Sequence, residues 1–440
     1  MRFSKYNIVS ENKGKKIIVN LRTSKWVRIS SDDVLERIDY LNKTNDFSLE
    51  NPVDKAFFDR GFIINDDHNE YEELKDWWQK ETEKSSRYLY IMLYVTDQCN
   101  FRCIYCPEKH ISNRFSQDNW DGLYNYINKA LVNNEIDNVS ICFFGGEPLL
   151  ETKKILEFLS KLEPLRQEYK NVKFKHKIVT NGYMLTPELY KKFNDFGIIG
   201  YQITVDGFKE THDHSRPRVD GKGTWDKIIQ NLKGIAETND DRAAVCIRTN
   251  NNDALAKTLE DFYKWITKEF PAKNFIFDIE GVANFSGDID EELLAKDDTE
   301  TRKRDNTIRK QYKDRMLKEQ FNVLSKGCSS CRTSNERMFS IFSNGDISKC
   351  EAIHMGEGSV VGKLQKDGSI EYNCDIEKWY TNMEYEECED CIQYPLCGAR
   401  ACPYKRMISD GNERYDCYKK NEDKFMENVH TFIESSGVFD

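Results

Sequence analysis

A regular alternation of short apolar runs with longer amphipathic runs begins at Tyr88 and constrains the fold more than any other feature of the sequence. The apolar runs have the length and the β-branched and aromatic content of strands, and segments such as NWDGLYNYINKALV between them have a helical period. Six strand-helix units in succession predict an α/β fold with a parallel sheet, either open or wound into a partial barrel. Ligands of such sheets bind at the carboxyl ends of the strands. The six runs are YLYIMLYV, VSICFF, FKHKIV, IIGYQITV, AAVCIRT and FIFDIEGV.

The first 66 residues predict a separate small module. Three alternating runs, KYNIV, KIIVN and KWVRI, have the pattern of strands, with a turn at residues 21–24. Ser30 or Ser31 precedes a helical segment and Asn51-Pro52 opens a second one, so the module has winged-helix character. The remaining boundaries are a linker helix over 67–87, the barrel over 88–285, a charged helical linker over 286–325, a cysteine-rich domain over 326–420 and a tail over 421–440.

Charge and hydropathy exclude several classes of partner. The formal net charge of -10 argues against nucleic acid, because phosphate contacts require clustered lysine and arginine. No run of about 18 apolar residues occurs, and the first twenty residues lack the apolar core of a signal peptide. We therefore expect a cytoplasmic protein that binds neither nucleic acid nor membrane.

The chain has fourteen cysteines, and a cytoplasmic chain keeps its thiols reduced and does not use them as a disulfide framework. Cys142 and Cys246 stand alone in apolar runs and are expected to be small buried hydrophobic residues. The other cysteines gather in two groups, one near Cys99 and one between Cys328 and Cys417. This distribution indicates metal ligation.

Directly after the first barrel strand, Cys99, Cys103 and Cys106 have the spacing C-x3-C-x2-C. Three thiolates on one short loop can hold three irons of a cubane cluster and leave the fourth iron open to a small molecule. A zinc site is the alternative, although structural zinc usually takes four ligands in C-x2-C pairs. The second strand ends in F-F-G-G-E-P, where Gly145 and Gly146 allow close approach of a ligand and Glu147 can accept from an ammonium group.

Together these motifs resemble the radical S-adenosylmethionine (SAM) superfamily over residues 88–282. The resemblance implies a partial (β/α)6 barrel of the TIM type, with a [4Fe-4S] cluster on Cys99, Cys103 and Cys106 and SAM on its open iron. Two more segments at the same edge are similar, T-N-G at Thr180–Gly182 and T-V-D-G at Thr204–Gly207, the latter followed by His212, Asp213 and Arg216. Asp206 is equally well explained as a turn residue, and Arg248 as the partner of a neighbouring side chain. The expected cofactor contacts are Tyr105, Gly145, Gly146, Glu147, Asn181, Thr204, Asp206 and Arg248.

The carboxyl-terminal cysteines resemble the SPASM extension of this superfamily. The resemblance implies two auxiliary [4Fe-4S] clusters, for which zinc ribbons are the alternative, and it leaves Cys374 unassigned. Cys397 and Cys402 are separated by four residues where the usual pattern has three. The implied ligands are Cys328, Cys331, Cys350 and Cys402 for the first cluster, and Cys388, Cys391, Cys397 and Cys417 for the second.

The amino-terminal module resembles the recognition element of enzymes that modify ribosomally made peptides. Such a module would bind a leader peptide as an added strand, here at the edge Lys25–Ile29, although it could also serve only for dimerisation or packing. The expected function is a peptide maturase that abstracts a hydrogen atom through a 5'-deoxyadenosyl radical and forms a thioether or carbon-carbon cross-link. Reduced flavodoxin or ferredoxin is the expected electron donor. Glu351 is the candidate base, and a solvated surface glutamate without a catalytic role is the alternative. The alternatives are a sulfatase-maturase-like cysteine or serine oxidase and a non-enzymatic zinc-stabilised binding protein.

Overall fold

A computed structural model describes most of the chain, in two compact units. The amino-terminal unit comprises Met1–Lys84, Lys318–Ser334 and Glu377–Asp440, and the barrel unit comprises Ser85–Leu317 and Asn335–Ile376. The described residues are 1–12, 15–282, 291–294, 299–317, 326–327, 331–350, 359–380, 384, 386–399, 402–403 and 422–435.

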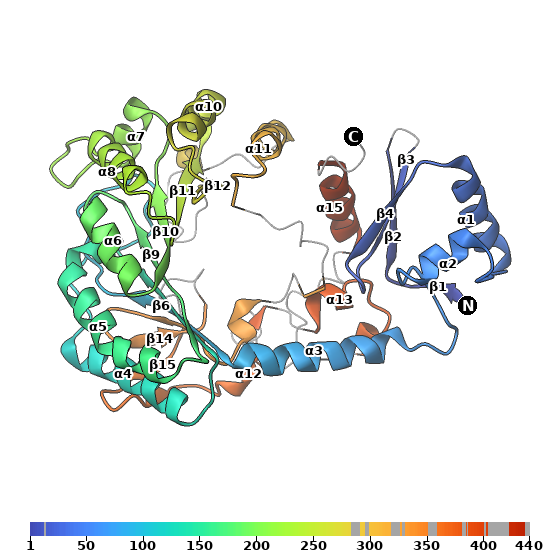
Figure 1. Ribbon diagram of the computed structural model, residues 1–440, viewed down its shortest axis with the longest axis horizontal. Helices are drawn as coiled ribbons and strands as arrows, with labels where there is room; N and C mark the ends of the chain where they lie inside the picture. The colour runs from blue at the N-terminus through green and yellow to red at the C-terminus, as the bar shows by residue number, and fades with distance from the viewer. Residues whose placement is uncertain are drawn as a thin grey trace. The chain divides into compact units, whose positions relative to one another are not determined.

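Six parallel strands form the centre of the barrel unit, and they lie in chain order across the sheet (Figure 1). This confirms the α/β class and the parallel sheet predicted from the sequence. Helices connect the strands, and two of the capping residues are Ser116 for α4 and Thr186 for α6. The strands are β6 Tyr88–Tyr94, β7 Asn138–Phe144, β9 His176–Thr180, β10 Ile198–Thr204, β11 Ala244–Asn251 and β12 Phe275–Gly281, and β8 Lys173–Phe174 pairs with β7.

The helices of this unit pack against apolar strand side chains. Leu89, Ile91 and Leu93 of β6 are fully buried, as alternate residues of one strand face must be. The helices are α4 Gln117–Val132, α5 Thr152–Glu168, α6 Pro187–Asp195, α7 Lys209–Ser215, α8 Trp225–Glu237, α9 Asp253–Ala256, α10 Leu259–Glu269 and α11 Thr299–Gln311. Short 3-10 turns are η1 Pro148–Glu151 and η2 Glu291–Leu293.

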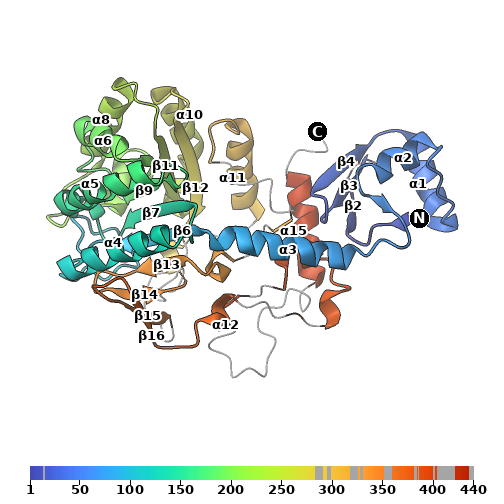
Figure 2. The same ribbon diagram turned by 60° about the horizontal axis from the view of Figure 1, so that its bottom comes forward.

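Part of the cysteine-rich segment continues the main sheet. The strand β13 (Met338–Ile341) pairs in parallel with β6, and three antiparallel strands follow it: β14 Asp346–Ser348, β15 Val360–Leu364 and β16 Ile370–Tyr372 (Figure 2). The sequence prediction placed all of 326–420 in one carboxyl-terminal domain, whereas residues 335–376 belong with the barrel. The reason is that β6 has a free edge which β13 pairs with over four residues.

The amino-terminal unit contains the predicted strands and helices. An antiparallel sheet has the order β2-β3-β4, with β2 Asn7–Asn12, β3 Lys15–Asn20 and β4 Lys25–Ile29, and the two helices are α1 Asp32–Thr44 and α2 Pro52–Phe58. The turn at residues 21–24 and the helix start at Asn51-Pro52 are as predicted; Asn51 Oδ1 accepts from the amides of Val53 and Asp54. The same unit also contains a short antiparallel strand pair, formed by β1 Arg2–Phe3 and β5 Ile63–Ile64.

The helix α3 (Glu70–Ser86) was predicted to be a linker, but it is part of a core. Its Leu74 and Trp78 are buried against the hairpin residues Tyr6 and Ile17 and against Tyr394 of the carboxyl-terminal segment. The segment predicted to be a tail contributes α15 (Glu422–Ser435), whose Val429 and Ile433 join the same core. Further short helical elements are η4 Arg332–Ser334, α12 Glu377–Tyr380, η5 Glu386–Cys388 and α13 Tyr394–Cys397.

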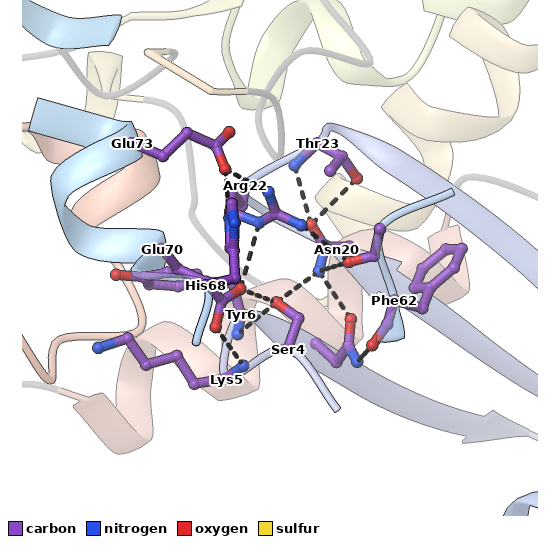
Figure 3. A network of polar contacts seen from close by, with 12 residues as sticks. Ser4, Lys5, Tyr6, Asn20, Arg22, Thr23, Phe62, His68, Glu70 and Glu73 are labelled. Atoms are coloured by element: carbon purple, nitrogen blue, oxygen red, sulfur yellow. Dashed lines mark hydrogen bonds and ion pairs between the residues drawn. The ribbon is translucent and has the colours of Figure 1, made fainter. Parts of the chain in front are cut away.

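A buried polar network joins the hairpin module to the start of α3 (Figure 3). The fully buried carboxylate of Glu70 accepts from Arg2 Nη1 at 3.1 Å and from the Lys5 amide at 3.2 Å, and it lies 3.2 Å from Arg22 Nε. Arg22 also donates to Glu73 at 2.5 Å. Because a buried charge is stable only with partners, this network fixes where α3 begins.

Candidate active site

The predicted site residues lie where β6, β7, β9, β10 and β11 end, as expected for a parallel sheet. The G-G-E-P loop after β7 runs along the backbone that precedes Cys99: the amide of Gly146 donates to Thr96 O at 2.9 Å, and that of Glu147 to Gln98 O at 2.8 Å. A Cβ on Gly146 would stand 2.3 Å from Gln98 O. The glycine is thus required by the close approach of two protein segments.

The cysteine loop is held by a segment that the sequence analysis did not connect with it. The amides of Arg102 and Ile104 donate to Pro217 O at 2.8 Å and Ser215 O at 3.0 Å, and the amide of Val219 donates to Asn100 O at 3.0 Å. Residues 100–104 therefore pair along residues 215–219, which comprise the last residue of α7 and the segment after it. The only sequence signal for this was the polar group around Arg216, which follows the fourth strand.

The three thiols of this loop are partly buried and form no disulfide. Burial raises the pKa of Cys99 to about 12, that of Cys106 to about 11, and that of Cys103 as well, so without a metal the thiols are neutral at pH 7. Within the described part of the chain, no three histidine, cysteine or acidic side chains converge as ligands of one ion. A cubane cluster binds each cysteine through a different iron, so this donor set fits such a cluster.

Glu147 binds the protein rather than standing free at the site. Its fully buried carboxylate accepts from Thr180 Oγ1 at 2.6 Å, from the Asn181 amide at 2.7 Å and from the Leu149 amide at 3.0 Å. Burial raises its pKa, and these donors oppose the shift. Glu147 therefore ties the loop after β7 to the loop after β9 and caps η1, and only part of its acceptor capacity remains for a ligand.

Asn181 stands beside the first cysteine. Its Nδ2 donates to Asn100 Oδ1 at 2.8 Å and lies 3.9 Å from Cys99 Sγ, while its Oδ1 accepts from the Tyr183 amide. The sulfur also accepts from the Phe101 amide at 3.4 Å. Hydrogen bonds to sulfur are among the features that tune iron-sulfur sites, so Asn181 is placed to act on a cluster as well as on a cofactor.

Tyr105 and Asp206 belong to one buried polar cluster. The hydroxyl of Tyr105 donates to Asp206 Oδ2 and accepts from Arg216 Nη1 at 2.7 Å and from Asn250 Nδ2 at 3.0 Å. Asp206 Oδ1 accepts from the Asn250 amide at 2.9 Å. Burial raises the pKa of Asp206, and Arg216 opposes the shift. Both carboxylate oxygens of Asp206 thus accept hydrogen bonds from the protein. Arg216 and Asn250 belong to the same cluster, and the sequence prediction gave them no role.

Arg248 and Thr204 are register partners on the neighbouring strands β11 and β10. The guanidinium of Arg248 lies 3.7 Å from Asp278 Oδ2, and its Nε donates to Asn250 Oδ1 at 3.2 Å. Arg248 therefore pairs with neighbours, which was the alternative to a cofactor contact. A role of either residue toward SAM stays a prediction.

The auxiliary ligands are described in part. Cys350 follows β14 in the barrel unit, whereas Cys331, Cys388, Cys391, Cys397 and Cys402 belong to the amino-terminal unit. Cys328, Cys417 and the candidate base Glu351 lie outside the described residues. Cys374 lies after β16, with its thiol 3.8 Å from Val361 O.

Parts of the chain are similar to known proteins. Residues 93–262 match the model of the radical SAM superfamily. The chain is 28% identical over 247 residues to the radical SAM cyclopropyl synthase TigE of Paramaledivibacter caminithermalis, over 47% of this chain and 48% of that protein. It is 25% identical over 333 residues to the cysteine-type anaerobic sulfatase-maturating enzyme of Clostridium novyi, over 69% of this chain and 84% of that enzyme. The match thus spans about half the length of the first relative.

Two solved structures share the fold. The structure of anSMEcpe with bound AdoMet and the Cp18Cys peptide has a TM-score of 0.56 at 19% identity, over 80% of this chain and 99% of that one. Streptococcus suis SuiB bound to its precursor peptide SuiA has a TM-score of 0.52 at 15% identity, over 94% of this chain and 98% of that one. The superfamily match and the related enzymes indicate that the chain is an enzyme with a radical SAM domain. This domain spans residues 93–262.

No helix in the described residues is both long and apolar enough to cross a membrane.

Proposed function

We propose that this enzyme is a peptide maturase that abstracts a hydrogen atom from a ribosomally made precursor peptide and installs an intramolecular thioether or carbon-carbon cross-link. The observation that carries the proposal is the position of the loop of Cys99, Cys103 and Cys106. Backbone hydrogen bonds hold the segment before Cys99 beside the Glu147 loop at the carboxyl edge of the sheet. When bound there, a [4Fe-4S] cluster and SAM would supply a 5'-deoxyadenosyl radical. The superfamily match sets aside the alternative of a non-enzymatic binding protein.

The residues of the site have distinct tasks in this proposal. The three thiols would hold the cluster, and Gly145 and Gly146 would let the amino group of SAM approach the backbone of their loop. Glu147 keeps this loop in place and offers its remaining acceptor capacity to that ammonium group. Because Glu147 is fully buried, its carboxylate is itself shielded from water.

The peptide substrate is supported by the surface of the amino-terminal unit. A hollow of about 320 Å³ lies between β4 and the helices α1 and α2, lined by Val27, Val34, Val53 and Ala56 among others. Trp26 of β4 has 56% of its surface exposed. A strand edge beside an apolar hollow is suited to bind an extended peptide, with main-chain hydrogen bonds for affinity and a pocket for one side chain. The solved relatives anSMEcpe and SuiB are each bound to a peptide, which supports the same substrate class.

A second candidate function is the oxidation of a cysteine or serine in a sulfatase. The observation that favours it is the alignment to the sulfatase-maturating enzyme, which covers 84% of that protein. The 84 residues of the amino-terminal unit that precede the barrel favour the peptide maturase, because a leader peptide requires a binding module. The proposal also includes two auxiliary clusters on the eight cysteines implied by the SPASM resemblance, with Glu351 as the base. Reduced flavodoxin or ferredoxin is the proposed electron donor.

The test is the iron and sulfide content after anaerobic reconstitution, together with release of 5'-deoxyadenosine from SAM under reducing conditions. We expect about twelve irons per chain, as three cubane clusters require. A Cys99/Cys103/Cys106 triple alanine variant is expected to lose about four irons and all cleavage. The matched control replaces Cys142 and Cys246, which are buried on β7 and β11, by alanine and is expected to keep both. Stoichiometric zinc without cleavage would refute the proposal.

The two candidate substrates are separated by mass spectrometry. A precursor peptide encoded beside the gene is expected to lose two hydrogens per cross-link and to gain resistance to alkylation if a thioether forms. A sulfatase-derived peptide that contains cysteine is expected to remain unchanged. The opposite result would favour the sulfatase maturase.

A further inference from the structure

Arg216 is a buried cation beside the cysteine loop. Its residue surface is only 6% exposed, its Nη1 donates to the hydroxyl of Tyr105 at 2.7 Å, and its guanidinium lies over the ring of Phe101 at 5.8 Å. The Nε is buried and has no hydrogen-bond partner among the described residues. Burial opposes this charge, whereas the Asp206 carboxylate of the same cluster favours it, and the pKa of Arg216 is raised above its ordinary value. Arg216 therefore stays charged.

The position of Arg216 is fixed by a second set of contacts. His212 is fully buried; its Nδ1 accepts from the Asp206 amide at 3.1 Å, and its Nε2 lies 3.1 Å from Thr224 Oγ1. Thr224 Oγ1 in turn donates to Arg216 O at 2.8 Å, so it accepts from Nε2 and the histidine is neutral with its proton on Nε2. Burial lowers the pKa of His212 and supports this state. The H-D-x-x-R group thus forms a rigid support for one arginine.

The charge of Arg216 acts on the cysteines. The guanidinium contacts Tyr105 and Phe101, which lie between Cys99 and Cys106 in the chain, so a positive charge lies beside this loop. A cubane cluster on three thiolates is negative, and its one-electron reduction adds a further negative charge. A buried cation at short range stabilises the more negative state, and low exposure limits screening by solvent.

We infer that Arg216 is a positioning residue that holds the cysteine loop through Tyr105 and raises the reduction potential of the cluster bound there. The inference rests on the proposed function, in which Cys99, Cys103 and Cys106 hold a [4Fe-4S] cluster. The step concerned is the transfer of one electron from an external one-electron donor to the cluster, with no bond made or broken in the protein. Asp206 lies in the same network with the opposite charge, so it lowers the potential that Arg216 raises.

The test is a redox titration of the reconstituted full-length enzyme with titanium(III) citrate and mediators, followed by electron paramagnetic resonance. The signal of the cluster on the cysteine loop is the difference from the Cys99/Cys103/Cys106 triple alanine variant. In Arg216→Gln we expect the ratio of reduced to oxidised cluster at a given potential to fall at least tenfold, a shift of 59 mV for a one-electron couple. Arg216→Lys is expected to retain most of the wild-type ratio.

Two further variants distinguish an electrostatic role from a structural one. Asp206→Asn removes the negative member of the network and is expected to shift the midpoint in the opposite direction, which loss of structure would not do. Lys222→Gln removes an exposed cation six residues along the same segment, with 75% of its side chain accessible, and is expected to change the ratio less than twofold.

The outcomes separate the inference from the proposed function. If wild-type enzyme binds no iron, the proposed function and the inference fall together. If wild-type enzyme shows the cluster signal but Arg216→Gln binds the same iron with an unchanged midpoint, only the inference is overturned. A shift of Arg216→Gln and Asp206→Asn in the same direction also overturns it. If Arg216→Gln does not fold, Arg216→Lys and Asp206→Asn decide.

Discussion

Replacing Gly146 by alanine tests the close approach of the two loops that build the site. The added Cβ would stand 2.3 Å from Gln98 O and 2.8 Å from Asp97 O, so the loop after β7 has to move by about 1 Å to restore ordinary contacts, which begin near 3.4 Å. This movement breaks the hydrogen bonds from the amides of Gly146 and Glu147, each worth about 0.5–1.5 kcal/mol. The expected loss is about 1–3 kcal/mol, or roughly 2–10 °C in melting temperature for a unit of this size.

The assay is thermal unfolding of the reconstituted enzyme, with iron content measured on the same samples. Gly200→Ala is the matched control, because Gly200 lies in β10 and a Cβ there meets no atom closer than 3.5 Å. We expect Gly146→Ala to lower both the melting temperature and the iron content, and Gly200→Ala to leave both near wild type. Equal behaviour of the two variants would refute the reasoning.

Three further predictions concern other parts of the chain. Glu70→Ala removes the buried carboxylate that pairs with the buried Arg22 and with Arg2. It is expected to destabilise the amino-terminal unit by about 3–5 kcal/mol in urea unfolding followed by tryptophan fluorescence, against about 0–1 kcal/mol for the partly exposed Glu81→Ala. Burial lowers the pKa of His176 to about 3, so the folded state keeps this ring neutral; stability is fully present above the ordinary value of 6.5 and declines as the pH falls toward 3. The melting temperature of His176→Asn is therefore expected to depend less on pH between 6.5 and 5 than that of the wild type. Ala56→Glu places a charge in the hollow beside β4 and is expected to weaken binding of a labelled precursor peptide at least tenfold in fluorescence anisotropy, with peptide-independent SAM cleavage unchanged.

Local signals in the sequence were sufficient for most elements. The parallel sheet followed from six apolar runs separated by helical periods, and the start of α2 followed from Asn51-Pro52, because both are determined by neighbours along the chain. The helix α3 was correctly predicted as a helix but not as part of a core. Its partners Tyr6 and Tyr394 are distant in sequence, and a charged surface pattern conceals its buried face of Tyr71, Leu74 and Trp78.

The sequence by itself determined the class of chemistry, since the spacing of Cys99, Cys103 and Cys106 places three thiols on one loop and the parallel sheet places that loop beside the G-G-E-P segment. Only the tertiary structure decided how the remaining polar residues are used. In the folded chain, Glu147 accepts hydrogen bonds from Thr180 and Asn181. Tyr105 donates to Asp206 and accepts from Arg216, which comes from the segment that pairs with the cysteine loop. The physical reason is that a buried polar group must find a partner, and the identity of that partner depends on which loops meet in space rather than on the residues that precede or follow it in the chain.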